Sequence, residues 1–190
     1  MSVKDSLHWA DQTARAVVAS RGKQKQYVCA AGITPSGTVH IGNFREMITV
    51  ELVVRALSDL GHDVRFIYSW DDYDVFRKVP ANLPKLDMLQ KHLRFPITSV
   101  PDPFGCHKSY AEHHEKEVED VLPQVGIAPE LLHQSKKYGS CEYADEIKFA
   151  LNNKEKVSEI LNTFRKESLG QDWIPLSVYC EKCHTDETKI

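Results

Sequence analysis

A strand, a long helix and a second strand follow one another between residues 27 and 70, joined by short connections. Residues 27–31 form the short apolar run typical of a buried strand. Residues 41–60 carry apolar side chains around much of a helical circumference and end before Gly61. Residues 63–70 predict the second strand. Two strands joined through a helix lie parallel with a right-handed crossover, so the chain is predicted to be an α/β protein with a parallel sheet.

Further helices are expected on both sides of this unit. Residues 3–21 place apolar side chains three and four positions apart and are followed by Gly22, which predicts an amphipathic helix. The other expected elements are helices at 86–93, 107–122, 140–151 and 154–168, a turn or short strand at 123–127, and a final strand at 174–179.

The loop between the first strand and the long helix is suited to binding phosphate. It contains Gly32 and Gly37, which let a ligand approach main-chain N–H groups, and it leads into the positive end of a helix. His40 stands where this helix begins, so its imidazole can donate a hydrogen bond to a phosphate oxygen. The alternative is that the glycines only shape a turn and that His40 caps the helix or lies on the surface.

Three carboxylates follow the second strand, at Asp71, Asp72 and Asp74. Ligands of open parallel sheets bind outside the carboxyl ends of the strands, so these side chains and the glycine-containing loop are predicted to share one site. The alternative interpretation is that they only solvate the strand end and cap the next helix.

Composition narrows the class of protein. The formal net charge of −3 argues against a stand-alone nucleic-acid-binding module. The absence of an apolar run of about 20 residues, and of a signal-peptide core at the N-terminus, predicts a cytoplasmic protein with no membrane partner.

The five cysteines favour free thiols or a metal over a disulfide framework. Cys180 and Cys183 are spaced as half of a zinc site, with His184 as a conceivable extra ligand.

Longer runs of sequence resemble one family. The motif HIGN at 40–43 is similar to the first signature motif of class I aminoacyl-tRNA synthetases, usually HIGH. The runs GITPSGTVHIGNFRE at 32–46 and VRFIYSWDDYDVFRKVP at 64–80 resemble class I lysyl-tRNA synthetases in particular. Residues 8–11, residues 134–136 and the cysteine pair are also similar to that family, so the resemblance covers essentially the whole chain.

The resemblance implies a Rossmann-like catalytic domain that uses ATP with Mg²⁺ to activate lysine and then transfers it to tRNA(Lys). By the family pattern, His40 and Asn43 are catalytic, and the lysine site comprises Gly32, Thr34 and Asp72. The residues expected to bind ATP are Ser36, Gly37, His40, Gly42 and Asn43. Cys180 and Cys183 would begin a zinc-binding insertion.

The domain expectation is a first half of the catalytic domain at 1–138, a helical segment at 139–173 and the start of the insertion at 174–190. The family's second signature, a KMSKS-like loop, does not occur in these residues. We therefore expect an N-terminal fragment that does not aminoacylate alone, with tRNA bound mainly elsewhere. The alternatives are a non-catalytic paralogue that binds nucleotide or tRNA, and a small nucleotidyltransferase, which would bring a second phosphate-clamping motif.

Overall fold

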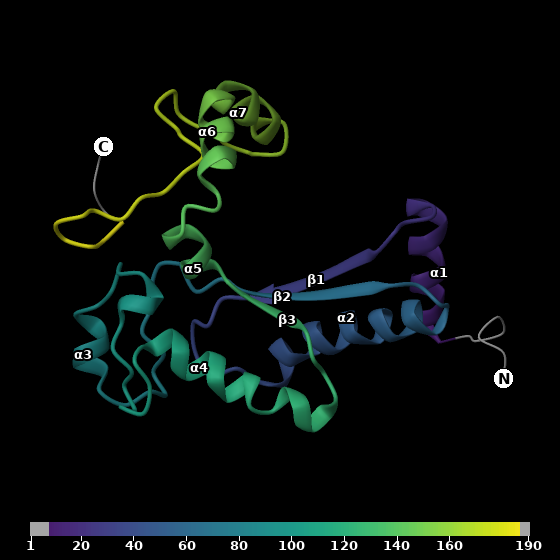
Figure 1. The fold of residues 1–190 in the computed structure, drawn as a ribbon. Coiled ribbons are helices and arrows are strands. Elements are labelled where there is room, and N and C mark those ends of the chain that lie inside the picture. The colour runs from purple at the N-terminus through teal and green to yellow at the C-terminus, as the bar shows by residue number, and fades with distance from the viewer. Residues whose placement is uncertain (1–7, 187–190) are drawn as a thin grey trace.

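A three-stranded parallel sheet lies at the centre of the computed structural model, which describes residues 8–186 (Figure 1). Its order is β1–β2–β3, with bounds Tyr27–Ile33, Val64–Trp70 and Glu130–His133. The register pairs Ile33 with Trp70 and Trp70 with His133, so the three carboxyl ends lie side by side. This arrangement confirms the predicted α/β class and gathers the residues that follow each strand at one edge of the sheet.

Helices bury the sheet through two apolar clusters. Met47 of α2 (Ile41–Asp59) packs with Phe66 and Trp70 of β2 and with Val118 of α4 (Tyr110–Glu119). The other cluster joins α1 (Trp9–Arg21), β1 and the far end of α2, through Ala10, Ala14, Tyr27, Ala56 and Leu57. Because α2 lies along the sheet, its N-terminus comes out beside the carboxyl ends of the strands (Figure 1).

A third apolar cluster holds the segment that follows β2. It includes Phe76, Leu89 and Tyr110, and it packs this segment against the start of α4. The segment contains α3 (Leu86–Gln90) and a 3₁₀ turn, η2 (Ile97–Ser99); a second 3₁₀ turn, η3 (Leu122–Val125), follows α4.

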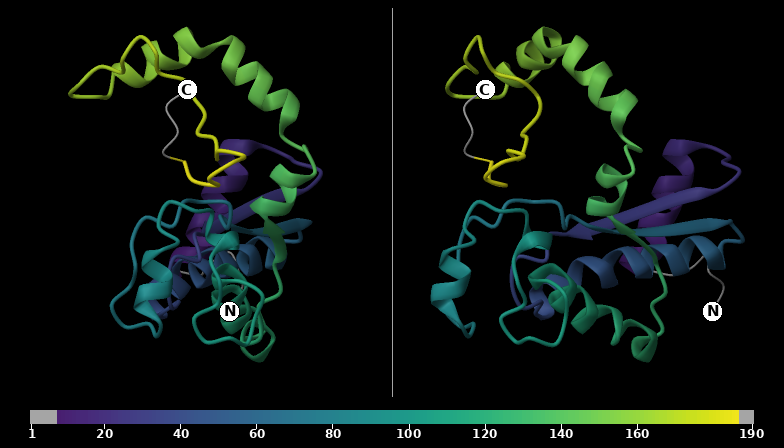
Figure 2. Two further views of the ribbon diagram at one scale, coloured as in Figure 1. Left: turned by 90° about the vertical axis from the view of Figure 1, so that its left-hand side faces the viewer. Right: turned by 60° about the vertical axis from the view of Figure 1, so that its left-hand side comes forward.

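The chain beyond β3 leaves the sheet and turns back. It forms α5 (Gln134–Gly139), α6 (Ala144–Asn152) and α7 (Lys154–Asn162), of which α6 and α7 follow one another across Asn153 as a bent helical arm that stands away from the sheet (Figure 2). The last described residues then approach the segment after β2, where Asp186 and Arg94 form an ion pair of 2.5 Å. None of the helices within residues 8–186 is long and apolar enough to cross a membrane.

One predicted strand is wrong, one predicted helix is shorter than expected, and two short elements were missed. The helix predicted at 154–168 ends at Asn162. The strand predicted at 174–179 is wrong, because this segment is irregular and pairs with no strand of the sheet. The short β3 and α5 were not foreseen from the sequence; β3 pairs with β2 over only four residues and is tied to it by Arg65 and Glu130 (Nη2–Oε1 2.6 Å). The start of the helix predicted at 3–21 lies outside the described residues, and the domain boundaries stay predictions.

Candidate active site

His40 is the N-cap of α2. Its ring Nδ1 accepts a hydrogen bond from the Gly42 N–H at 3.0 Å, and Asn43 Oδ1 accepts from the His40 N–H at 3.3 Å. His40 therefore caps the helix, as one of the two alternatives predicted. The same hydrogen bond determines which ring nitrogen carries the proton. Because Nδ1 accepts from a backbone N–H, a neutral imidazole must carry its hydrogen on Nε2. His40 is exposed, so this Nε2–H is available to an incoming ligand.

The same geometry requires a glycine at position 42. A Cβ atom added at Gly42 would lie 2.8 Å from Cε1 and 2.9 Å from Nδ1 of His40. The imidazole therefore occupies the space that any other residue at position 42 would need. His40, Gly42 and Asn43 form one unit that aims Nε2–H and the first turn of α2 toward the same region, which is the arrangement that binds phosphate.

Two hollows flank this loop. Thr34 and Ser36 line a cavity of about 420 Å³ together with the charged side chains of Asp74, Arg77 and Lys78. His40 lines a neighbouring apolar cavity of about 230 Å³. The main chain at Ser36 is held by Tyr110 of α4, whose hydroxyl donates to the Ser36 carbonyl at 2.9 Å.

Gly32 lies where β1 and β2 approach closely. A Cβ at Gly32 would be 2.8 Å from the Ser69 carbonyl oxygen, so a side chain there would push the strands apart. Just beyond, the Asp71 N–H donates to the Ile33 carbonyl at 2.9 Å. Asp71 therefore stands directly against the turn that contains Gly32 and Thr34.

Asp72 points the other way, into the protein. It is 2% exposed, and its carboxylate accepts hydrogen bonds from the backbone N–H and the hydroxyl of Ser135, at 2.8 and 2.5 Å. His133 Nδ1 lies 3.8 Å from it. The structure thus places Asp72 as a cap on the start of α5, close to the alternative role considered for this acidic cluster.

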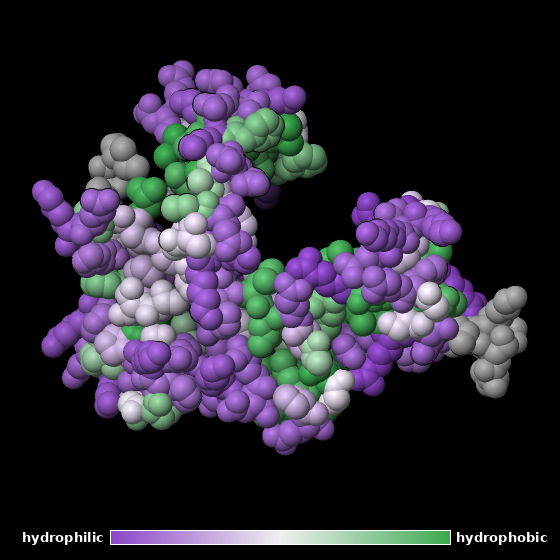
Figure 3. Space-filling view, viewed as in Figure 1, coloured by the Kyte–Doolittle hydropathy of each residue, from purple (hydrophilic) through white to green (hydrophobic). Residues whose placement is uncertain are grey.

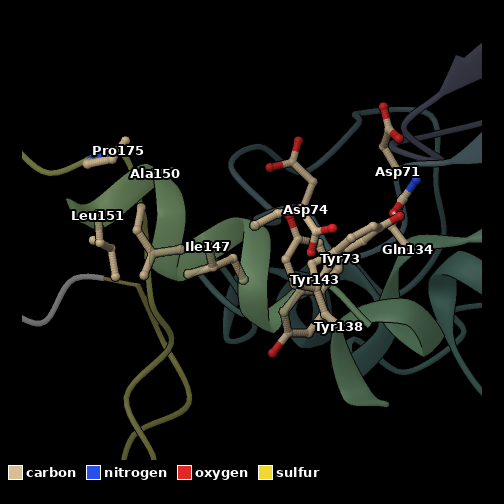
Figure 4. Close-up of a pocket in the computed structure, with 12 residues that line it drawn as sticks. Asp71, Tyr73, Asp74, Gln134, Tyr138, Tyr143, Ile147, Ala150, Leu151 and Pro175 are labelled. Atoms are coloured by element: carbon tan, nitrogen blue, oxygen red, sulfur yellow. The ribbon is translucent and has the colours of Figure 1, made fainter. Parts of the chain in front are cut away.

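Asp71 and Asp74, in contrast, line a pocket of about 500 Å³ (Figure 4). Tyr73, Tyr138 and Tyr143 form its middle, with Tyr73 and Tyr138 stacked at 5.3 Å between ring centroids. Its far end is apolar and is formed by Ile147, Ala150, Leu151, Pro175 and Leu176. Carboxylates beside aromatic faces favour a cationic ligand with an aliphatic part.

Cys180 and Cys183 lie in a tight turn in which the His184 N–H donates to the Cys180 carbonyl at 2.8 Å. Among residues 8–186, these two cysteines are not part of any group of three or more metal-binding side chains.

A different group, which the sequence reasoning missed, has the character of a metal site. Asp102, Cys106, His107 and His113 place one ligand atom each within 4.8 Å of all the others. Cys106 Sγ is 3.2 Å from Nδ1 of both histidines and 3.4 Å from Asp102 Oδ2. One thiolate, two imidazoles and a carboxylate are four ligands that tetrahedral zinc accepts. The spacing Asp-x₃-Cys-His-x₅-His was the signal that could have revealed it.

Electrostatics prepare Asp102 for this role. Burial alone would raise its pKa, but hydrogen bonds from the backbone N–H groups of Phe104, His107 and Cys106 lower the pKa of Asp102 to about 2. Burial and the adjacent Asp102 raise the pKa of the Cys106 thiol. A bound cation would reverse that effect, because metal ions hold a coordinating thiol deprotonated.

A family model and the similar proteins of known name agree with one another. The family model described as "tRNA synthetases class I (K)" matches residues 7–190. The chain is 56% identical to the lysine–tRNA ligase of Treponema pallidum over 188 residues, which is 97% of the chain and 35% of that protein. It is 45% identical to the lysine–tRNA ligase of Pyrococcus horikoshii and 37% identical to that of Methanocaldococcus jannaschii, covering 97% of the chain and 35% and 34% of those proteins. The chain spans about a third of the length of these curated relatives.

Proposed function

Because this chain belongs to the class I tRNA synthetase family (K), we propose that it supplies part of a catalytic domain that joins lysine to tRNA(Lys) with ATP. In the first step, the lysine carboxylate attacks the α-phosphorus of ATP, a phosphorus–oxygen bond to the leaving pyrophosphate breaks, and lysyl-adenylate forms. The chemistry asks the protein mainly to position the reactants and to stabilise charge on phosphate oxygens. Mg²⁺ is expected to accompany ATP and to neutralise part of that charge.

One observation carries the proposal: the His40, Gly42 and Asn43 unit at the start of α2. Its fixed tautomer leaves Nε2–H free to donate to a phosphate oxygen as negative charge builds up there. Ser36 and Gly37 shape the loop beside it, and the open N–H groups of α2 add positive potential. This unit is the part of the ATP site that the chain contributes.

For lysine, we propose that the α-ammonium binds at the turn with Gly32 and Thr34, against the carboxylate of Asp71. Burying an ammonium group without an opposing charge is unfavourable. Two exposed carboxylates lie near Gly32: Asp71, whose N–H bonds to the Ile33 carbonyl, and Glu46, whose Oε1 accepts from the Gly32 N–H at 3.5 Å. We choose Asp71 because it also lines the pocket proposed for the lysine side chain. The expected contribution of Asp72 is then indirect, because its oxygens hold Ser135. The pocket lined with tyrosines accommodates the aliphatic side chain of lysine.

The test is pyrophosphate exchange by a chimera in which residues 1–190 replace the matching third of the Treponema pallidum relative. We expect lysine-dependent exchange, and we expect His40→Ala to lower it roughly 10²- to 10³-fold, the scale for one transition-state donor. His40→Asn keeps a capping oxygen for Gly42 but removes the Nε2–H, so it should lose exchange without losing the cap. A folded chimera that binds nucleotide without exchange would support the non-catalytic paralogue instead.

tRNA(Lys) is proposed to bind mainly through the two-thirds of such an enzyme that this chain does not span. The cytoplasm is the proposed compartment, because protein synthesis uses charged tRNA there.

We further propose that Asp102, Cys106, His107 and His113 bind a structural Zn²⁺. The ion would hold the 102–107 loop against α4. The hydroxyl of Tyr110 in α4 donates to the Ser36 carbonyl, so the same helix supports the loop proposed to bind ATP. Metal analysis of the purified chain should find one zinc per molecule, lost in Cys106→Ser and kept in Cys180→Ser. Stoichiometric zinc in Cys106→Ser would refute this site.

A further inference from the structure

A chain of hydrogen bonds runs from the base of the α6–α7 arm to the end of β2. The Tyr143 hydroxyl donates to Gln134 Oε1 at 2.7 Å, and Gln134 Nε2 donates to Ser69 Oγ at 2.7 Å. The Ser69 hydroxyl then donates to Asp71 Oδ1 at 2.9 Å. Tyr143 precedes α6, Gln134 begins α5 and Ser69 lies in β2, so the chain links three elements.

The order of donors makes this chain directional. The Gln134 oxygen is occupied by Tyr143, so its NH₂ group must face Ser69. The Ser69 oxygen accepts from Gln134, so its hydroxyl hydrogen is committed to Asp71. Each member fixes the orientation of the next, and the chain ends on a carboxylate.

Asp71 is the exposed end of this chain. Its Oδ1 is held by Ser69, whereas within residues 8–186 its Oδ2 has no hydrogen-bond partner. Asp71 lines the tyrosine pocket, and its N–H bonds to Ile33 at the end of β1. Figure 4 shows Gln134 beside Asp71 at one end of the pocket. Because Ser69 holds Oδ1, the Asp71 side chain keeps the rotamer that presents Oδ2 to the pocket.

We propose that Gln134 and Tyr143 are positioning residues that orient Asp71 toward the α-ammonium of lysine. This inference rests on the proposed function, because it takes lysine as the ligand of Asp71. No residue of α6 or α7 is buried, so the Tyr143 hydrogen bond and the edge-to-face contact of Tyr143 with Tyr138, at 5.1 Å between ring centroids, hold the base of the α6–α7 arm. The placement of this arm is thereby linked to the orientation of the Asp71 carboxylate.

The experiment compares lysine with 6-aminohexanoate, which is lysine without its α-ammonium, in the chimera described above. Gln134→Leu should raise the KM for lysine about 10-fold, the scale for a hydrogen bond to a charged group, with the KM for ATP unchanged. Tyr143→Phe should do the same more weakly. Inhibition by 6-aminohexanoate should not change in either variant, because this molecule lacks the α-ammonium that Asp71 is proposed to bind.

The matched control is Gln124→Leu, which removes an exposed glutamine amide whose one hydrogen-bond partner within residues 8–186 is the Asp120 carbonyl. Equal weakening of lysine and of 6-aminohexanoate in Gln134→Leu would show a general structural role and overturn the inference. An unchanged KM for lysine would overturn it as well. The proposed function fails separately, by loss of exchange in the unsubstituted chimera.

Discussion

At residue scale, the start of α2 shows why a short motif carries information. The imidazole of His40 sits over Gly42, and Asn43 returns a hydrogen bond to the His40 N–H. Helix capping and phosphate binding were considered as alternatives for His40, yet the two roles are compatible, because Nδ1 serves the cap and Nε2 stays exposed. The cap sets the tautomer, so the structural role prepares the chemical role that we propose.

Gly42→Ala tests this dependence. The new Cβ would stand 2.8 Å from Cε1 of His40 and displace the imidazole. We expect exchange in the chimera to fall by roughly 10²-fold, near the loss in His40→Ala. Stability should change little, because the helix propensity gained with alanine, up to about 1 kcal/mol, is offset by loss of the His40 cap, which costs about the same. Gly139→Ala, where a Cβ meets nothing within 4 Å, is the control and should leave exchange unchanged.

At element scale, α4 connects the proposed metal site with the sheet edge. One part of the helix carries His113, while Glu115 and Glu119 are directed to His133 at the end of β3. Glu115 Oε2 lies 3.4 Å from His133 Nδ1, and Glu119 Oε1 lies 3.8 Å from Nε2. Asp72, just after β2, is the third carboxylate near this imidazole. A protonated His133 therefore holds α4, β3 and the end of β2 together.

This arrangement predicts a pH dependence of stability. The interaction with Glu115 raises the pKa of His133 above its ordinary 6.5; Asp72 adds to this effect, while burial and Lys136 oppose it. A raised pKa means that the stabilisation is fully present below pH 6.5 and is lost as the pH rises through the folded-state pKa. Urea unfolding should therefore show His133→Gln less stable than the parent chain at pH 6, with a smaller difference at pH 9.

Glu115→Gln provides the check on that interpretation. Without the carboxylate, the pKa of His133 should fall toward its ordinary value, so the pH-dependent part of the difference should shrink. A difference between His133→Gln and the parent that is constant from pH 6 to 9 would contradict the assignment of charge to His133.

At the scale of the whole molecule, the sheet with α1, α2 and α4 contains the buried apolar clusters, and the α6–α7 arm stands apart from it (Figure 2). Figure 3 shows apolar residues on the surface of this region; Phe149 of α6 is 71% exposed, and Phe164, just after α7, is 86% exposed. Elements with few buried contacts open locally at low free energy. We therefore expect the α6–α7 arm to open more easily than the sheet.

Hydrogen–deuterium exchange of the purified chain tests this difference. Backbone amides of α6 and α7 should exchange roughly 10²-fold faster than those of β2 and the buried part of α2, because local opening avoids global unfolding. Tyr143→Phe should accelerate α6 further and leave β2 unchanged. Equal protection of α6, α7 and β2 would contradict this picture.

By itself, the sequence determined the parallel βαβ unit, the loop with His40 at a helix start, and the family, because these depend on local periodicity and on motifs within short stretches of chain. It did not determine β3, whose four residues gain their strand character from pairing with β2. Nor did it separate Asp71 from Asp72, because which of two adjacent carboxylates faces a pocket depends on Ser135 arriving from 63 positions away. The Tyr143 to Asp71 chain was likewise decided only by tertiary structure, since packing alone brings those atoms together. The candidate metal group from Asp102 to His113 has a local spacing in the sequence, but only the structure showed that its ligand atoms converge.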